Sequence, residues 1–138
     1  MDTEAIKAFF DQDAFAKTSG AVIERIGDDE VVCTLTIEDR HLNAAGIVQG
    51  GAIFTLADFA FAVASNLDDL INDTQAINVG QSTNIHFFKP AKGQKLIAKA
   101  IPLQKGRKLS VYRVTLTDDL GTNIAEMSGV AYRMTKVG

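Results

Sequence analysis

Asp58 is a single carboxylate in an almost wholly apolar stretch of the sequence, which runs from Gly51 to Asn66. This stretch predicts a helix that is hydrophobic nearly all round, and a helix of that kind is normally buried. The other polar positions, Thr55 and Ser65, fall on the same stripe of the helix as Asp58. Aspartate is almost never fully buried without a partner. We therefore expect Asp58 either to form a structural ion pair or loop cap, or to act as a general base or nucleophile.

Gly50-Gly51 stands directly before this apolar stretch and supplies a second chemical group. The first N–H groups of a helix have no partner within the helix, and the positive end of its dipole favours anionic oxygen. Glycine also lets a ligand approach the backbone closely, although a glycine pair can equally serve only to shape a tight turn. Because Asp58 follows two turns later, the segment combines a base with a place that stabilises negative oxygen.

The spacing of these two groups bears on how a site could be built. Gly50 and Asp58 are eight residues apart, which is about 12 Å along a helix that rises 1.5 Å per residue. A single reacting carbon would have to lie about 3 Å from both groups. One helix cannot easily arrange this, whereas two antiparallel copies can, with Gly50 of one copy facing Asp58 of the other. The spacing therefore predicts a site shared between two protomers.

Positive charge is concentrated in the second half of the chain. Residues 74–117 contain eight of the 14 basic residues and none of the 17 acidic ones, so this region should present a positive field to an anionic partner. Nucleic acid fits poorly, because the net charge is −3, the pI is near 5.3 and aromatic residues do not alternate with the basic ones. We expect a small phosphorylated ligand, with a solvated lysine-rich surface as the alternative.

Other catalytic schemes lack the residues they need. His41 and His86 have no cysteine or histidine companions at the spacing of a zinc site, so we expect no metal. His41 is predicted to lie in a solvated loop and His86 on the face of a strand. The sequence contains no Gly-x-Ser-x-Gly elbow, no P-loop and no Gly-x-Gly-x-x-Gly motif.

The composition is that of one ordinary globular domain, which we place at residues 1–138. Hydrophobic residues make up 46% of the chain and charged residues 22%. No stretch is expected to span a membrane, because the longest apolar candidate carries Asp58 at its centre. The N-terminal residues Asp2 and Glu4 do not resemble a signal peptide, and the single Cys33 is predicted to be an inert core residue. These features favour a cytoplasmic protein.

The pattern of the chain predicts an α+β domain. Short helical segments are expected within residues 2–18, and alternating or β-branched runs predict six strands. Apolar residues on alternate positions are typical of an antiparallel sheet with one covered face. We expect this sheet to wrap around one long central helix. The strands are predicted at about residues 21–26, 31–37, 75–88, 94–104, 108–117 and 122–135, with the helix at 51–66 between the second and third.

Two strands, one helix and then four strands is the order of the hotdog fold, and the motif around the helix resembles that of a hotdog family. The chain resembles the PaaI-like acyl-CoA thioesterases over nearly its whole length, including the turn Lys89-Pro90-Ala91-x-x-Gly93 and the segment Gly106-Arg107-Lys108. The motif reads Asn43-x-x-Gly46-x-x-Gln49-Gly50-Gly51-x-x-Phe54-x-Leu56-Ala57-Asp58.

The resemblance implies a role for each residue of this motif. Asp58 would be the catalytic carboxylate, the N–H of Gly50 would polarise the thioester carbonyl, and Asn43 would stand beside that carbonyl or the attacking water. The family usually has His-Gly-Gly, whereas this chain has Gln49-Gly50-Gly51. Gln49 can donate or accept hydrogen bonds but cannot exchange a proton near neutral pH. A residue that holds water on the third strand would correspond to Ser82 or Thr83, although Gly80 is the third possibility.

The resemblance also implies the substrate and the assembly. The substrate would be an acyl-CoA, with coenzyme A as part of the substrate and no separate cofactor. Gly51 would contact it, and the basic side chains of Lys89, Arg107 and Lys108 would hold its phosphates. Phenylalanines of the helix region favour an aromatic or medium-length acyl group. The protein would be at least a homodimer and, by the same resemblance, a dimer of dimers.

Two other functions stay open for a chain of this fold. Gln49 in place of the family's histidine is compatible with a hotdog protein that binds acyl-CoA or another ligand without hydrolysing it. An enoyl-CoA hydratase of the same fold is less favoured, because the helix region lacks a histidine placed to pair with Asp58 as acid and base.

Overall fold

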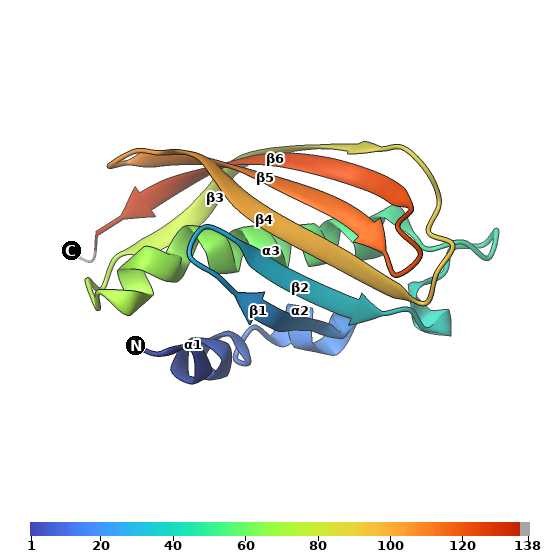
Figure 1. Cartoon of the computed structure of the whole chain (residues 1–138), viewed down its shortest axis with the longest axis horizontal. Helices are drawn as coiled ribbons and strands as arrows, with labels where there is room; N and C mark the ends of the chain where they lie inside the picture. Colours follow the sequence, from blue (N-terminus) through green and yellow to red (C-terminus); the bar gives the residue numbers. More distant parts are fainter. Residues whose placement is uncertain (136–138) are drawn as a thin grey trace.

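The computed structural model describes residues 1–135 and confirms the predicted α+β hotdog architecture: an antiparallel sheet packed against one long helix (Figure 1). The six strands lie in the order β1-β2-β4-β5-β6-β3. Their bounds fall within a few residues of the predicted ones. The strands are β1 (Ala21–Ile26), β2 (Val31–Thr36), β3 (Ile77–Phe87), β4 (Lys95–Lys105), β5 (Leu109–Asp118) and β6 (Asn123–Met134).

Helix α3 (Gly50–Ile71) is longer than the sequence predicted and forms the centre of the core. By length and composition alone it could cross a membrane, a property that the sequence analysis did not assign to any segment. The structure instead uses it as a core helix, because Leu56, Ala60 and Val63 are fully buried. They pack with inward residues of the strands, among them Leu35 and Leu96, in one continuous hydrophobic cluster.

One face of α3 remains open, so the prediction that this helix is buried all round is wrong. On the predicted stripe Asp58 is exposed and Thr55 is half-buried, whereas Ser65 is buried. Gly51, at the start of the helix, is exposed as well. The apolar residues Ile53, Leu56 and Ala57 are buried, on other sides of the helix. Asp58 therefore does not carry the cost of full burial within one protomer.

Two short helices, α1 (Thr3–Phe10) and α2 (Ala14–Ser19), cover α3 on the side where β1 lies (Figure 1). Each begins at an aspartate whose side chain accepts a hydrogen bond from the helix: Asp2 from the N–H of Ala5, and Asp13 from that of Ala16. The ring of Phe10 meets the ring of Phe59 edge to face, with 6.1 Å between the ring centres. This pair packs the α1–α2 junction against α3.

The segment before α3 is tied to α2 through a buried histidine. His41 is buried, so its predicted place in a solvated loop is wrong. Its Nδ1 accepts the N–H of Glu38 at 2.9 Å, and its Nε2 lies 2.7 Å from the carbonyl oxygen of Ser19. The Arg40 guanidinium donates to the carbonyl of Thr18. A polar ring is buried here because both of its nitrogens find backbone partners.

Strand β3 is an open edge of the sheet. Within residues 1–135 it pairs only with β6, and most of its residues are exposed, including His86, which lies on a strand as predicted. Gly80 and Gly129 lie beneath the ring of Phe61, where an added Cβ would approach the ring to 3.2 and 2.9 Å. Phe61 is thereby seated in the core between α3 and the sheet.

Candidate active site

The carboxylate of Asp58 stands on the open face of α3. No ion pair within residues 1–135 involves it, so the structural ion pair that the sequence left open is not formed within the protomer. Desolvation by its surroundings raises the pKa of Asp58, and the negative charge of Asp13 raises that pKa further. A carboxylate in this setting holds a proton more tightly than usual and is a stronger base.

The N-terminus of α3 presents free N–H groups at Gly50 and Gly51. Gln49 is the N-cap residue but its side chain makes no capping hydrogen bond. Within the described chain, no acceptor bonds either glycine N–H. These donors and the positive end of the helix dipole can therefore receive an anionic oxygen from outside the protomer.

Two side chains border this terminus. The ring of Phe87 on β3 lies so close to Gly50 that an added Cβ would approach it to 3.2 Å. The amide oxygen of Gln49 folds back over Gly51, where an added Cβ would come within 2.9 Å. The Gln49 side chain thus lies beside Gly51, while Phe87 is a neighbour that the sequence analysis did not name.

Asn43 shapes the loop that leads into α3. Its side-chain oxygen accepts the N–H groups of Ala45 at 2.9 Å and of Ile47 at 3.2 Å, and its own N–H donates to the carbonyl of Ile47. The oxygen of the amide is therefore engaged in the loop. The amide NH₂ makes no hydrogen bond to the rest of residues 1–135, and the residue is exposed, so it can donate to a bound group.

The structure does not bring Asp58 and Gly50 together within one protomer. Both belong to the same helix, so they are about 12 Å apart along its axis, as the spacing predicted. On β3, Thr83 pairs with Gly129 and so faces α3, whereas Ser82 faces the opposite side of the sheet. Of these two candidates, only Thr83 lies on the side of the helix.

The phenylalanines of α3 that favoured an aromatic or medium-length acyl group serve mainly as core. Phe61 packs against Tyr112, and Phe59 packs against Phe10, so both are buried. Phe54 is partly buried against the same core. The half-exposed Phe87 is an aromatic ring that lies next to Gly50.

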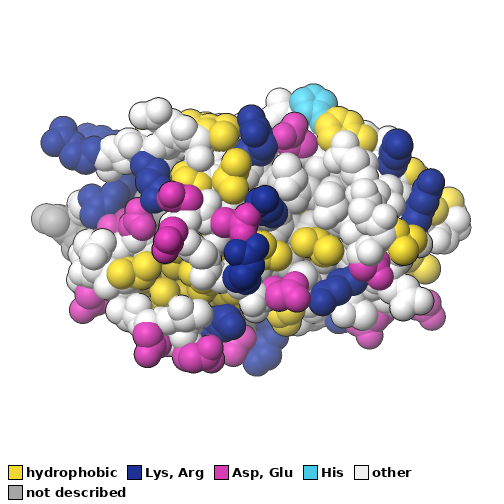
Figure 2. All heavy atoms as spheres, in the orientation of Figure 1, with side chains coloured by type: hydrophobic (Ala, Val, Ile, Leu, Met, Phe, Trp, Pro, Cys, Tyr) yellow, Lys and Arg dark blue, Asp and Glu magenta, His cyan; other side chains and the backbone are white. Residues whose placement is uncertain are grey.

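The basic residues of segment 74–117 do not form one patch on the protomer. Lys89 and Lys92 lie in the β3–β4 turn, and Arg107 and Lys108 lie in the β4–β5 turn, so all of β4 separates the two pairs. Its 11 residues extend about 33 Å. Figure 2 accordingly shows Lys and Arg side chains at both ends of the molecule. The prediction that both turns of one chain hold the same phosphates is wrong for a single protomer.

Several basic side chains are already paired, which leaves two in the β4–β5 turn. Lys105 contacts Asp68 at 3.0 Å and Asp29 at 3.7 Å, and its hydrogen bond to Asp68 raises its pKa. Arg107 and Lys108 are exposed and form no ion pair within residues 1–135. They are the basic groups of this turn that can meet an external anion.

The opposite turn depends on Asp118, a residue that the sequence analysis did not single out. Its carboxylate is buried and accepts four backbone N–H groups, from Lys92, Gly93, Leu120 and Thr122, at 2.8 to 3.0 Å. Burial raises the pKa of Asp118, but these donors outweigh burial and hold it well below its usual range. In the sequence, only the acidic pair Asp118-Asp119 at the end of a predicted strand marks this place. That pair does not indicate the backbone donors 25 and 26 positions away.

The described residues contain no group of three His, Cys, Asp or Glu side chains placed to hold a metal. Cys33 is buried in the core as predicted, and burial raises the pKa of its thiol to about 12. At the start and on the open face of α3, the groups that could take part in a reaction are the Asp58 carboxylate, the free N–H groups, and the amides of Asn43 and Gln49.

Comparison with known proteins gives the same family as the motif. The model of the thioesterase superfamily matches residues 45–125, which include Gln49, Gly50, Asp58, Ser82 and Thr83. A protein of Deinococcus radiodurans is 39% identical over 102 residues, covering 73% of this chain and 65% of that protein. The chain thus spans just under two thirds of the length of this relative.

A second relative matches over most of both chains. The acyl-coenzyme A thioesterase PaaI of Escherichia coli is 30% identical over 128 residues, covering 92% of this chain and 87% of that protein. The solved structure of the Escherichia coli PaaI protein superposes with a TM-score of 0.81 at 28% identity, covering 92% of this chain and 88% of the other. The chain therefore belongs to the thioesterase superfamily, as a PaaI-like protein with the hotdog fold.

Proposed function

We propose that this protein is an acyl-CoA thioesterase, in which Asp58 is the base or nucleophile and the N–H of Gly50 is the oxyanion donor. The observation that carries the proposal is that α3 holds both groups that the reaction needs. A basic carboxylate without an ion pair lies on its open face, and free N–H groups lie at its start. The relative named acyl-coenzyme A thioesterase PaaI supports the substrate class.

The reaction follows from these groups. Asp58 takes a proton from a water molecule whose oxygen attacks the thioester carbon, or its carboxylate attacks that carbon to give an anhydride that water then hydrolyses. In either route the carbonyl oxygen becomes negative and accepts a hydrogen bond from the N–H of Gly50. The carbon–sulfur bond then breaks and coenzyme A leaves as the thiolate. In the water route this step releases the free acid, and the thiolate takes up the proton held by Asp58. In the anhydride route water then hydrolyses the anhydride, which releases the free acid and restores the Asp58 carboxylate.

The site is proposed to form between two protomers. The open face of α3 carries the small or short side chains Gly51, Thr55 and Ala62 beside Asp58, so a second helix could approach closely. Strand β3 offers an unpaired edge for association of the same two copies. Antiparallel α3 helices would bring Gly50 of one protomer towards Asp58 of the other. A dimer of dimers and a cytoplasmic location remain part of this proposal.

The acyl group is proposed to be aromatic or of medium length. Phe87 supports this, because its half-exposed ring lies next to Gly50, whose N–H would bind the thioester carbonyl. The Asn43 amide would donate to the carbonyl or to the attacking water. Gln49 would orient the substrate through its neutral amide.

A binding protein without hydrolytic activity is the second candidate, and the neutral amide at Gln49 is the observation that favours it. An acyl-CoA panel assayed with a thiol reagent separates the two functions. Hydrolysis of at least one acyl-CoA, with turnover falling roughly 10²-fold in Asp58→Asn, is the expected result. Binding of acyl-CoA with no release of thiol would show that the protein is a binding protein. Hydration of an enoyl-CoA would show that it is an enoyl-CoA hydratase.

A further inference from the structure

The residues before α3 form a small hairpin that is closed by backbone hydrogen bonds. The N–H of Gln49 donates to the carbonyl of His41 at 2.8 Å, and an isolated β-bridge forms between the next two positions inside this pair. Asn43 lies within the hairpin, and Gln49 ends it as the N-cap residue of α3. The hairpin 41–49 therefore carries both amides of the candidate site and leads directly into the free N–H groups of α3.

The N-cap of α3 is held through its backbone. The Gln49 side chain makes no capping hydrogen bond, but the carbonyl of Gln49 accepts the N–H of Ala52 at 3.0 Å and that of Ile53 at 3.3 Å. Its own N–H is the one that bonds the His41 carbonyl. The direction of the Gly50 N–H therefore depends on where His41 stands.

The ring of His41 fixes that place. It is 6% exposed, and its Nδ1 takes the N–H of Glu38 at 2.9 Å. A backbone N–H can only donate, so Nδ1 carries the lone pair and the proton of the neutral ring is on Nε2. Nε2–H then donates at 2.7 Å to the carbonyl of Ser19, the last residue of α2. One tautomer of His41 thus joins the 3₁₀ helix η1 (Asp39–His41) to the end of α2.

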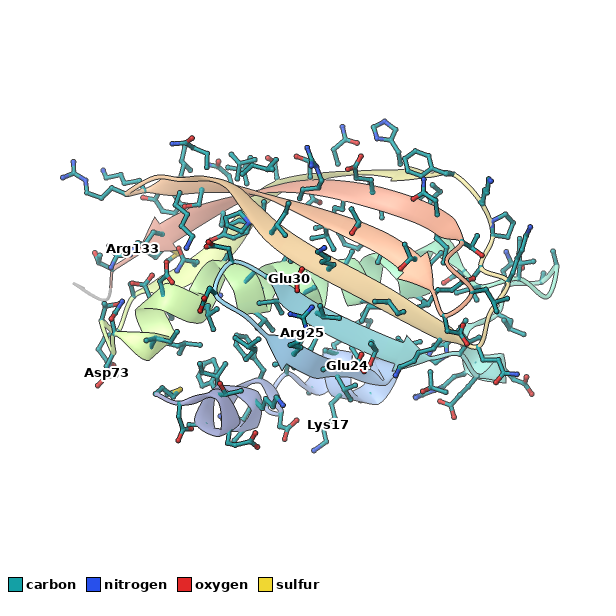
Figure 3. The ribbon with its side chains drawn as sticks, in the orientation of Figure 1. Lys17, Glu24, Arg25, Glu30, Asp73 and Arg133 are labelled. Atoms are coloured by element: carbon teal, nitrogen blue, oxygen red, sulfur yellow. The ribbon has the colours of Figure 1, made fainter. Side chains whose placement is uncertain are left out.

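The end of α2 needs these donors, because the last carbonyls of a helix have no partner within it. The carbonyl of Thr18 receives the guanidinium of Arg40. That of Ser19 receives the imidazole of His41. Lys17, the basic residue of the last turn of α2, extends away from the molecule instead (Figure 3). Arg40 is exposed and His41 is buried, so His41 is the inner of the two links between α2 and the loop before α3.

We propose that His41 is a positioning residue of the thioesterase site, which holds the hairpin 41–49 against α2 and so fixes the Gly50 N–H and the amides of Asn43 and Gln49. The inference rests on the proposed function of those groups. Donors that are already in place stabilise an oxyanion without reorganising during the reaction. A displacement of about 1 Å caused by a change far from the chemistry can cost about 10²-fold in rate.

Two substitutions separate the two hydrogen bonds of the ring. His41→Asn can place an amide oxygen where Nδ1 stands and accept the N–H of Glu38, but it is too short to reach Ser19. His41→Gln can place an NH₂ group where Nε2 stands and donate to Ser19. In His41→Asn kcat should fall by about ten-fold, between one lost hydrogen bond and a 1 Å displacement, with KM nearly unchanged. His41→Gln should restore most of this kcat.

Asn66→Ala is the matched control for a loss of stability alone. The Asn66 side chain also joins two segments through backbone groups, because it accepts the N–H of Asn78 on β3 at 2.8 Å and donates to the carbonyl of Asn78 at 3.1 Å. It lies towards the other end of α3, away from the hairpin. The free energy of unfolding should fall in both Asn66→Ala and His41→Asn, whereas kcat should fall only in His41→Asn.

Amide hydrogen exchange at Gln49 gives a readout that does not require activity, because this N–H is bonded to the His41 carbonyl. Its exchange should be faster in His41→Asn and unchanged in Asn66→Ala. Unchanged exchange or unchanged kcat in folded His41→Asn overturns the inference, and so does an equal fall of kcat in Asn66→Ala or in His41→Gln. If the exchange responds as expected but the unchanged protein hydrolyses no acyl-CoA, the anchoring of the hairpin stands and the proposed function fails.

Discussion

At the scale of single residues, the backbone N–H of Gly50 can be removed without a large change to the helix. Proline lacks this N–H and is favoured at the first position of a helix, and the preceding Gln49 already has the extended conformation that proline requires, with φ −68° and ψ 142°. Gly50→Pro should therefore fold, and its kcat should fall by about 10²–10³-fold, as for loss of an oxyanion donor.

Gly50→Ala is the control for this experiment. It retains the N–H and adds only a methyl group against the end of the Phe87 ring, which is half-exposed and can shift. Its kcat should stay well above that of Gly50→Pro when both are measured on the same acyl-CoA. Equal kcat values in the two variants would remove the Gly50 N–H from the mechanism.

Gln49 tests whether this position orients the substrate or exchanges a proton. Its side chain reaches over Gly51 beside the free donors, so an orienting role requires only a hydrogen-bonding group. Gln49→Ala should lower kcat/KM modestly, by about five-fold for one lost neutral hydrogen bond, and Gln49→His should retain or raise it. An inactive, folded Gln49→His protein would show that the geometry here differs from that of the family.

At the scale of elements, Asp118 joins the β3–β4 turn to the end of β5. Asp118→Asn replaces a carboxylate oxygen by an NH₂ group that faces backbone donors, so the free energy of unfolding at pH 7 should fall by about 2 kcal/mol or more. Asp119→Asn, at an exposed carboxylate in the same turn, should cost less. Denaturant unfolding of the three proteins measures both values.

The pH dependence of this stabilisation has a definite sign. Because the folded-state pKa of Asp118 lies below its unfolded value of about 3.9, its contribution is present above that pH and is lost as the pH falls towards the folded value. Stability of the unchanged protein should therefore fall on acidification more steeply than that of Asp118→Asn. If the free energy of unfolding falls equally with pH in the two proteins, the Asp118 carboxylate is not the source of this stabilisation.

At the scale of the whole molecule, mixing two inactive variants tests whether the site is shared. Asp58→Asn and Gly50→Pro are each expected to be inactive alone, but a mixed dimer would contain one site with an intact Asp58 and an intact Gly50. Co-refolding equal amounts should restore about one quarter of the normal activity, because half of the dimers are mixed and each has one working site. A mixture as inactive as its components would place both groups of each site on one protomer.

The two basic turns can be assigned with substrates that differ in their phosphates. Neutralising Arg107 and Lys108 together should raise KM for an acyl-CoA by about five-fold, the scale of two exposed ionic contacts. It should leave KM unchanged for an acyl-pantetheine thioester that lacks the nucleotide. The same two KM values, measured after Lys89 and Lys92 are neutralised together, show whether the β3–β4 turn binds the phosphates instead. Equal effects on both substrates would make the β4–β5 turn a charged surface only.

Much of the architecture follows from local patterns. Alternating residues in segments such as Ile97–Leu103 predict strands because successive side chains point to opposite faces, and this holds whatever the strand pairs with. The apolar run before Asn66 likewise predicts a helix, and the motif from Asn43 to Asp58 identifies the family. These features depend on neighbours in the chain, so the sequence alone was sufficient to determine them.

What lies on each face of an element was decided only by the tertiary structure. Composition suggested that α3 is buried all round, but the sheet and the short helices cover only part of it and leave Asp58 open. His41 is buried because the carbonyl of Ser19, 22 positions away in the sequence, is folded against it. The charge distribution along the sequence likewise suggested one basic region, but β4 separates the basic residues of the β3–β4 turn from those of the β4–β5 turn. Burial, electrostatic coupling and distance depend on which distant segments pack together, and no local pattern records that.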